Sequence, residues 1–200
     1  MLEAADLTCE RGARTLFRGL SFRVETGTLL RIAGANGSGK TSLLRILCGL
    51  ALPARGEVRW KGEPIRRLGE EYSRRLVHIG HAPGLKDELT AAENLAITST
   101  LAGVSASGQA VRDALGRFTI PPEKQIKSLS QGQRRRAALA RLALSAEVPL
   151  WLLDEPFAAL DASASSLVEE LIRGHAGRGG AVVYTTHQAA GLRDTRVLEL

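Results

Sequence analysis

The sequence has few of the features that mark secreted proteins, proteins with a structural metal site or membrane-spanning proteins. It contains two cysteines, Cys9 and Cys48, each in an apolar segment and without C-x-x-C spacing. They are typical of small buried side chains in a reducing compartment and argue against a disulfide framework or a zinc site. No apolar run approaches the roughly 20 residues that cross a bilayer, and the opening residues MLEAADLTCERG contain no signal-peptide core. We therefore expect a cytosolic chain, or one on the cytosolic face of a membrane.

The overall composition is that of one soluble globular domain. Of the 200 residues, 44% are hydrophobic and 24% are charged, which is enough apolar material to build a core. The net charge of +6 favours polyanions or an anionic membrane surface as neighbours. Because many nucleotide-binding proteins are also basic, this charge does not select a class of partner by itself.

Hydrophobic patterning predicts an α/β fold. Residues 2–34 show the alternation of β-strands, broken by glycines. VPLWLLDE (148–155) and GAVVYTTH (180–187) are apolar enough to be fully buried strands, with a helix predicted over 163–177 between them. Buried strands that alternate with helices are typical of a parallel sheet. Residues 82–148, which lie between the N-terminal strands and these later strands, are predicted to be mostly helical.

A phosphate-binding motif stands between the predicted strand TLLRIA and the predicted helix KTSLLRIL. The residues GANGSGKT, from Gly34 to Thr41, match G-x-x-x-x-G-K-[ST]. In this motif the glycines turn backbone N–H groups toward phosphates, and the helix N-terminus adds positive potential. The lysine reaches the β- and γ-phosphates, and the threonine hydroxyl binds Mg²⁺. An incidental glycine-rich turn would not explain the flanking strand and helix, so we expect ATP to contact Gly34, Ala35, Asn36, Gly37, Ser38, Gly39, Lys40, Thr41 and Ser42.

Two carboxylates end the later buried strand, LWLLDE. The carboxyl ends of strands are where open α/β sheets bind ligands. Asp154 is suited to the Mg²⁺ shell together with Thr41, and Glu155 could polarise an attacking water as general base. Asp-Glu at a strand end is common by chance. The pair indicates a catalytic site only because the same chain also contains the phosphate-binding motif.

A second anion site is predicted in LSQGQRRRAALARLAL, from Leu129 to Leu144. Ser130 has the character of a helix N-cap, and the backbone amides around Gly132 would face an anion at the start of that helix. The simpler interpretation is a capped amphipathic helix with Arg134–Arg136 in solvent. This segment alone does not separate the two.

The order of these motifs resembles the ATP-binding cassette (ABC) ATPases. GANGSGKT, LSQGQ, LWLLDE, AALD and TTH follow one another as in that family, over essentially the whole chain. The resemblance implies a P-loop NTPase fold, with a RecA-like parallel-sheet core and an N-terminal antiparallel β subdomain. Within a single domain of residues 1–200, these would comprise residues 1–81 and 149–200, and residues 82–148 would form an inserted helical subdomain. The implied activity is ATP hydrolysis, with ATP and Mg²⁺ as cofactors.

The same resemblance implies a site that two copies of the chain share. In ABC ATPases two cassettes meet head to tail, and the signature of each covers the ATP held by the P-loop of the other. Carried over, Asp161 in AALD would be the D-loop residue at the dimer seam. His187 would contact the γ-phosphate and act with Glu155 and Lys40 in catalysis. The signature residues acting in trans would be Ser130, Gln131, Gly132 and Gln133.

Three positions depart from the family pattern. Gln131 replaces the first glycine of the LSGGQ-type signature, which requires a backbone conformation that a side chain tolerates. The aromatic residue that stacks on adenine is missing near Glu10 and Arg11. Arg11 could stack through its planar guanidinium, and Phe17 is a second candidate. His81 occupies the position of the Q-loop glutamine, and an imidazole, unlike an amide, titrates near neutral pH.

The segment IGHAPG, residues 79–84, leaves several roles open for His81. His78 and His81 have a spacing that could suggest a metal or heme site, but a strand residue and a loop residue should point in different directions. A buried core histidine is another alternative. The resemblance favours the Q-loop role, in which His81 links the γ-phosphate region to the helical subdomain.

Further fragments narrow the resemblance to one branch of ABC proteins. CERGARTLFRGLSF, IGHAPGLKDELTAAENL and LDEPFAALD are similar to the ATPase subunits of cytochrome c maturation, also called heme exporter ATP-binding subunits. This branch implies a peripheral subunit on the cytoplasmic side of the bacterial inner membrane. Its partners would be a second copy of the chain, an integral membrane subunit and other cytochrome c maturation proteins. Hydrolysis would drive heme export or release of a heme-loaded chaperone.

Two alternatives stay open at this point. An ATPase subunit of another ABC importer or exporter would have the same chemistry and a different cargo. An ABC ATPase that acts on nucleic acid would suit the basic charge. Against it, the interval between Thr41 and Leu129 has neither sustained heptads nor a zinc-binding insert, so we expect no nucleic-acid partner.

Overall fold

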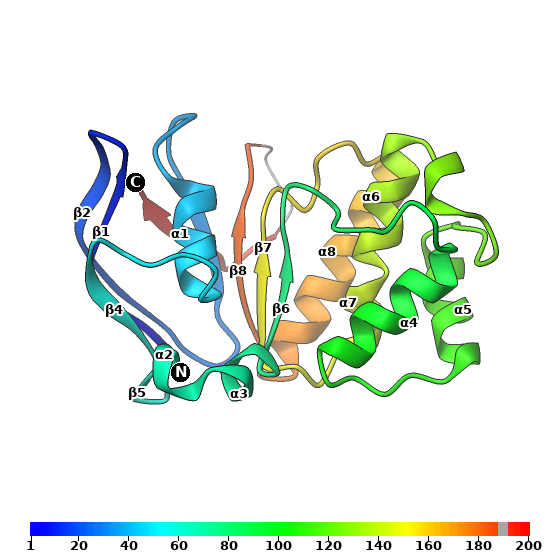
Figure 1. Ribbon diagram of the computed structural model, residues 1–200, viewed down its shortest axis with the longest axis horizontal. Coiled ribbons are helices and arrows are strands. Elements are labelled where there is room, and N and C mark those ends of the chain that lie inside the picture. The colour runs from blue at the N-terminus through cyan, green and yellow to red at the C-terminus, as the bar shows by residue number, and fades with distance from the viewer. Residues whose placement is uncertain (188–191) are drawn as a thin grey trace.

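Two β-sheets form the framework of the protein. The computed structural model describes residues 1–187 and 192–200, which form a four-stranded antiparallel sheet in the order β2-β1-β4-β5 and a five-stranded parallel sheet in the order β6-β7-β8-β3-β9 (Figure 1). The antiparallel strands are β1 (Leu2–Arg11), β2 (Arg14–Val24), β4 (Arg55–Trp60) and β5 (Glu63–Pro64). The parallel strands are β3 (Leu29–Ala33), β6 (Leu76–Ile79), β7 (Leu150–Leu153), β8 (Ala181–Thr185) and β9 (Arg196–Glu199).

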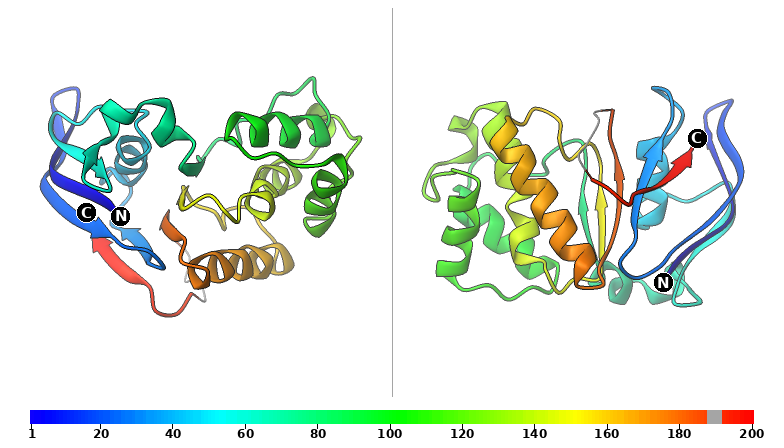
Figure 2. Two further views of the ribbon diagram at one scale, coloured as in Figure 1. Left: turned by 90° about the horizontal axis from the view of Figure 1, so that it is seen from below. Right: turned by 180° about the vertical axis from the view of Figure 1, so that it is seen from behind.

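The helices divide between the two sides of the parallel sheet. Helix α1 lies between the two sheets, whereas α4 to α8 gather on the opposite side (Figures 1 and 2). None of the helices in the described residues is long and apolar enough to cross a membrane. The bounds are α1 (Lys40–Leu47), α2 (Ile65–Leu68), α3 (Glu70–Ser73), α4 (Ala91–Leu101), α5 (Gly108–Arg117), a 3₁₀ turn η1 (Ile126–Ser128), α6 (Gln131–Leu139), α7 (Arg141–Leu144) and α8 (Ala162–Gly177).

Burial on both faces explains why β7 and β8 are continuous apolar runs. Every residue of these two strands is buried. Successive side chains of a strand point to opposite faces, so Leu150 and Leu152 join the core around α1, while Trp151 and Leu153 join the core around α8. The predicted parallel sheet with helices on both sides is thereby confirmed, together with the antiparallel sheet at the N-terminal end of the chain.

The local differences from the prediction have physical causes. Within the predicted residues 2–34, the pattern does not give the bounds of β2, because pairing with β1 holds a stretch from Arg14 onward whose exposed side chains show little apolar alternation. The short helices α2 and α3 give too little periodicity to detect. The predicted helix after Ser130 is divided into α6 and α7 at Ala140.

Candidate functional site

The sequence motifs meet at the carboxyl edge of the parallel sheet. The N-terminus of α1 and the ends of β6, β7 and β8 lie at one edge of the molecule, the upper edge in Figure 1. They enclose a cavity of about 330 Å³. Its lining residues are Arg11, Leu16, Asn36, Gly37, Gly39, Lys40, Thr41, Ser42, His81, Asp154, Glu155 and His187.

The loop before α1 has a backbone that only glycines adopt easily. Gly34 has a φ of 140° and Gly39 one of 109°, a region that L side chains rarely occupy. A Cβ on Gly34 would lie 2.7 Å from the Leu200 carbonyl oxygen. Lys40 is 8% exposed, and its ammonium folds over the loop to donate to the carbonyls of Gly34 at 2.8 Å and Ala35 at 3.0 Å.

Asp154 stands at the centre of a hydrogen-bond network between α1, β7 and β8. Its carboxylate is 2% exposed. The Thr41 hydroxyl donates to Oδ2 at 2.8 Å, and the Thr185 hydroxyl donates to Oδ1 at 2.7 Å. A buried carboxylate is tolerated only when such partners satisfy it. The network therefore fixes the direction of Asp154 and leaves its Oδ2 edge beside the P-loop.

Glu155 is held in an unusual backbone conformation. Its φ is 49°, which is uncommon for a residue with a side chain and is often found at functional sites. Its backbone N–H donates to Thr185 Oγ1 at 2.9 Å, and its Oε2 accepts from the backbone N–H of His187 at 3.2 Å. The imidazole Nε2 of His187 lies 3.4 Å from Oε1. The strained turn thus directs the carboxylate toward His187 and the cavity.

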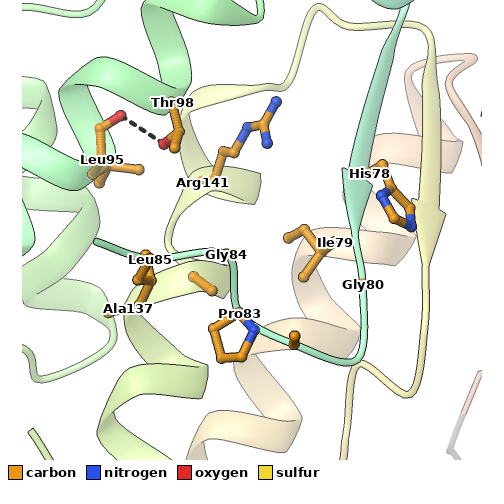
Figure 3. A pocket seen from close by; sticks show the side chains of 12 residues that line it. His78, Ile79, Gly80, Pro83, Gly84, Leu85, Leu95, Thr98, Ala137 and Arg141 are labelled. Atoms are coloured by element: carbon orange, nitrogen blue, oxygen red, sulfur yellow. Dashed lines mark hydrogen bonds between the residues drawn. The ribbon is translucent and has the colours of Figure 1, made fainter. Parts of the chain in front are cut away.

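The two histidines of the IGHAPG region lie in separate pockets. His81 lines the cavity beside Asp154 and Glu155. His78 lines a neighbouring pocket of about 190 Å³, bounded by β6 with its following loop and by α4, α6 and α7 (Figure 3). Burial lowers the pKa of His78. The two imidazoles thus line different spaces, as expected for a strand residue and a loop residue three positions apart.

One side of the cavity is formed by Arg11 of β1 and Leu16 of β2. Arg11 lines the cavity as expected. Phe17, the second candidate, does not line the cavity but packs against the core around α1 and against Gly39, where a Cβ would meet its ring at 3.1 Å. Leu16 was not predicted, since one leucine in a weakly alternating strand carries no signal of its own.

The signature segment lies outside this cavity. Ser130 caps α6 as predicted, accepting from the backbone N–H of Gln133 at 3.3 Å, and Gln133 Oε1 accepts from the Ser130 N–H at 3.0 Å. Gln131 is the first residue of α6 and has no positive φ, which explains why a side chain is tolerated there. Neither these residues nor Gly132 line the P-loop cavity. Asp161 caps α8 through the Ala164 N–H at 2.8 Å.

Two buried side chains of the site carried no sequence signal. Thr185 is fully buried and connects Asp154 to Glu155. Arg135 is 5% exposed, which contradicts the alternative in which the whole Arg134–Arg136 run lies in solvent. The buried face of a run of three arginines is set by the packing of α6 and does not follow from composition.

Comparison with known proteins defines the class of this site. The family model described as ABC transporter matches residues 17–158. The chain belongs to this family and is an ABC-type, ATP-binding ATPase. Among solved structures, one titled as the ATP-binding subunit of an ABC transporter has a TM-score of 0.88 at 26% identity and covers 100% of this chain and 85% of its own.

Curated relatives narrow the similarity within that family. The chain is 53% identical to a protein of Nitrosospira multiformis over 94% of this chain and 91% of the relative. It is 47% identical to a protein of Dechloromonas aromatica over 100% and 98%. Both relatives are named cytochrome c biogenesis ATP-binding export protein CcmA.

Proposed function

We propose that the protein is the ATP-hydrolysing subunit of an ABC transporter-type complex in cytochrome c biogenesis. The observation that carries the chemistry is the network of Asp154 with Thr41 and Thr185 beside the P-loop, with Glu155 and His187 next to it. The names of the similar relatives support the biological setting.

The P-loop would bind the ATP phosphates with the backbone N–H groups from Gly34 to Ser42. Lys40 already points across the loop to two carbonyls. On binding, its ammonium would exchange those neutral acceptors for phosphate oxygens, which form stronger, charge-assisted bonds. The Arg11 guanidinium and the Leu16 side chain would cover the base.

The arrangement of Thr41 and Asp154 fits Mg²⁺. A hydroxyl oxygen and a carboxylate oxygen lie 2.8 Å apart at the P-loop, and Mg²⁺ prefers such oxygen ligands. The other carboxylate oxygen of Asp154 is engaged by Thr185, so Oδ2 is the atom that would face the cation. Bound Mg²⁺ supplies neutralisation of charge on the β- and γ-phosphates.

Glu155 would act as the general base for the attacking water. Its carboxylate lines the cavity, with His187 on one side. A carboxylate held by a backbone N–H on Oε2, with Oε1 free of hydrogen bonds within the described residues, takes the water proton without first reorienting, and this lowers the barrier. His187 would also contact the γ-phosphate, and His81, in the Q-loop position, would sense it from the helical side.

A homodimer would complete the site. Ser130, Gln131, Gly132 and Gln133 lie outside the cavity of their own chain, so they would cover ATP held by a second copy, with Asp161 at the seam. A solved ATP-binding cassette titled as dimeric and bound to ADP and Pi has the same fold, with a TM-score of 0.87 at 24% identity over 100% of this chain and 94% of its own.

The remaining partners follow from the proposed branch. The subunit would sit peripherally on the cytoplasmic side of the bacterial inner membrane, bound to a CcmB-like integral membrane protein and to other cytochrome c maturation proteins. The chain would form one domain, with residues 82–148 as the helical subdomain that meets the membrane partner, and residues 1–81 and 149–200 as the nucleotide-binding part.

Glu155→Gln tests the chemistry. The variant should bind ATP as wild type does, lose turnover by about 100-fold or more, and accumulate as an ATP-dependent dimer in light scattering. Glu147→Gln, the same exchange on an exposed residue before the other end of β7, is the control. A Glu155→Gln protein that still hydrolyses ATP, or stays monomeric at saturating ATP, contradicts the proposal.

Tagged protein purified from membranes tests the setting. A CcmB-like subunit in the eluate, and restored heme-stained c-type cytochromes in a strain that lacks its own maturation ATPase, would support it. A different membrane subunit would indicate another transporter. Salt-sensitive binding of DNA or RNA with stimulated turnover would indicate a nucleic-acid ATPase.

A further inference from the structure

The buried guanidinium of Arg135 joins the ends of two parallel strands. Its two terminal nitrogens donate to three backbone carbonyls: Nη1 to Gly80 at 2.7 Å, and Nη2 to Asp154 at 2.7 Å and to Glu155 at 2.8 Å. Gly80 follows β6, and the other two residues follow β7. A single side chain of α6 therefore holds both loops that border the nucleotide cavity.

The neighbouring arginines of the same helix are used differently. Arg134 forms an ion pair with Asp87 at 2.8 Å, and Arg136 lies 3.4 Å from Asp161; their partners are exposed carboxylates. Arg135 instead has only carbonyls as hydrogen-bond acceptors in the described residues, and its Nε is buried without one.

Such an arrangement is costly for packing alone. A buried cation loses its hydration, and an apolar side chain of similar volume is often as stable or more stable. Burial lowers the pKa of Arg135, while the charges of Asp154 and Glu155 oppose that shift. The guanidinium remains charged, because arginine does not deprotonate in proteins, and its charge lies beside the two site carboxylates.

The carbonyl of Glu155 is the informative partner. Glu155 has a φ of 49°, so its peptide units are turned out of the ordinary strand direction. Thr185 holds its backbone N–H, and Arg135 holds its carbonyl as well as that of the preceding residue. With both ends of the residue fixed, the Cα–Cβ bond of Glu155 has a set direction, and the side chain starts toward the cavity that it lines.

We propose that Arg135 is a positioning residue for Glu155, acting through the backbone of the Asp154–Glu155 turn and not by contact with the nucleotide. The inference rests on the proposed role of Glu155 as general base. Because the same guanidinium holds Gly80, which lines the pocket of Figure 3, it also keeps the loop that carries His81 at a set distance from Glu155.

The test compares Arg135→Gln, Arg135→Lys and the control Arg134→Gln. For Arg135→Gln we expect kcat to fall about 10- to 100-fold, since a shift near 1 Å at a reacting group has this order of effect. The Kd for ATP should stay within about three-fold, because no P-loop bond is removed. Lysine keeps the charge but lacks the two coplanar terminal nitrogens of the guanidinium, so Arg135→Lys should recover part of the lost kcat. Arg134→Gln should keep the wild-type kcat.

The readouts separate positioning from a merely structural role and from failure of the proposed function. Thermal melting sets an assay temperature at which each variant is folded; if Arg135→Gln does not fold, Arg135→Lys carries the test. A kcat equal to wild type in the folded Arg135 variants, or a parallel loss of ATP binding and kcat, overturns the inference. If wild type fails to hydrolyse Mg·ATP, both alone and with its co-purified partners, or if Glu155→Gln retains turnover, the proposed function itself fails.

Discussion

The two ends of strand β7 use burial in opposite ways. At the carboxyl end, Asp154 and Arg135 are charged and buried, and Glu155 has a strained backbone. Three residues earlier in the chain, Trp151 is fully buried and stacks on His175 of α8, with ring centroids 3.9 Å apart and planes inclined by 4°. One end fixes polar groups at a cost in stability, and the other end contributes stability by the packing of aromatic rings.

This difference teaches where substitutions should act. Polar networks at a buried edge are retained when their geometry serves a reaction, because apolar replacements would be at least as stable. Close-packed aromatic side chains away from the cavity contribute stability without touching the nucleotide. We therefore expect variants at the Trp151 end to change the free energy of unfolding, and variants at the Asp154 end to change turnover.

The largest effect should follow Trp151→Ala. Removing a fully buried tryptophan leaves a cavity beside α8 and should lower the free energy of unfolding by about 3–5 kcal/mol. Turnover per folded molecule should stay at the wild-type value. Urea titration and an activity assay normalised to folded protein check this, with Trp151→Phe as the milder member of the series. A large loss of kcat in the folded fraction would contradict the inference that the Trp151 end of β7 affects stability and not turnover.

Thr185→Val should act on the other end. Valine has nearly the shape of threonine, but it leaves Asp154 Oδ1 and the Glu155 N–H without the hydroxyl that joins them. We expect kcat to fall about 10- to 100-fold and the free energy of unfolding to fall by about 1–3 kcal/mol. Thr185→Ser, which retains the hydroxyl, is the matched control and should stay near wild type in both. An unchanged kcat in Thr185→Val would show that the network serves stability alone.

The acid stability of the Trp151 end depends on His175. Burial lowers the pKa of His175 from 6.5 to about 4. Since the unfolded chain takes up the proton first as the pH falls, this site costs nothing above about pH 7 and destabilises the fold between pH 6.5 and 4, by about 2 kcal/mol at pH 5. Urea titrations at pH 7, 6 and 5 measure this slope. His175→Phe should remove that part of it, and an identical slope in the variant would contradict the assignment.

Prediction from sequence succeeded where a local motif determines the structure. GANGSGKT defines its own backbone through Gly34 and Gly39, and the apolar runs of β7 and β8 identify strands buried on both faces. Arg135 and Thr185 escaped because their roles arise from contacts between segments far apart in the chain. No local pattern distinguishes a buried arginine from its partly buried neighbours when all three lie in one run.

The smallest effect should come from Gln131→Gly. This variant tests whether the side chains that affect turnover extend from the Asp154 end of β7 to the start of α6. Gln131 is exposed, begins α6 and has an ordinary helical backbone, so a glycine there relieves no strain. Because glycine loses more backbone entropy on folding, the free energy of unfolding should fall by less than about 1 kcal/mol. Turnover should remain within about two-fold of wild type, because Gln131 begins α6 and would face the ATP of the second copy through its backbone N–H, which both glycine and alanine retain. The matched Gln131→Ala variant should be at least as stable as wild type. If both variants lose turnover alike while folding normally, the Gln131 side chain itself contacts the nucleotide or the second copy, and the polar end extends beyond the Arg135–Asp154–Glu155 network.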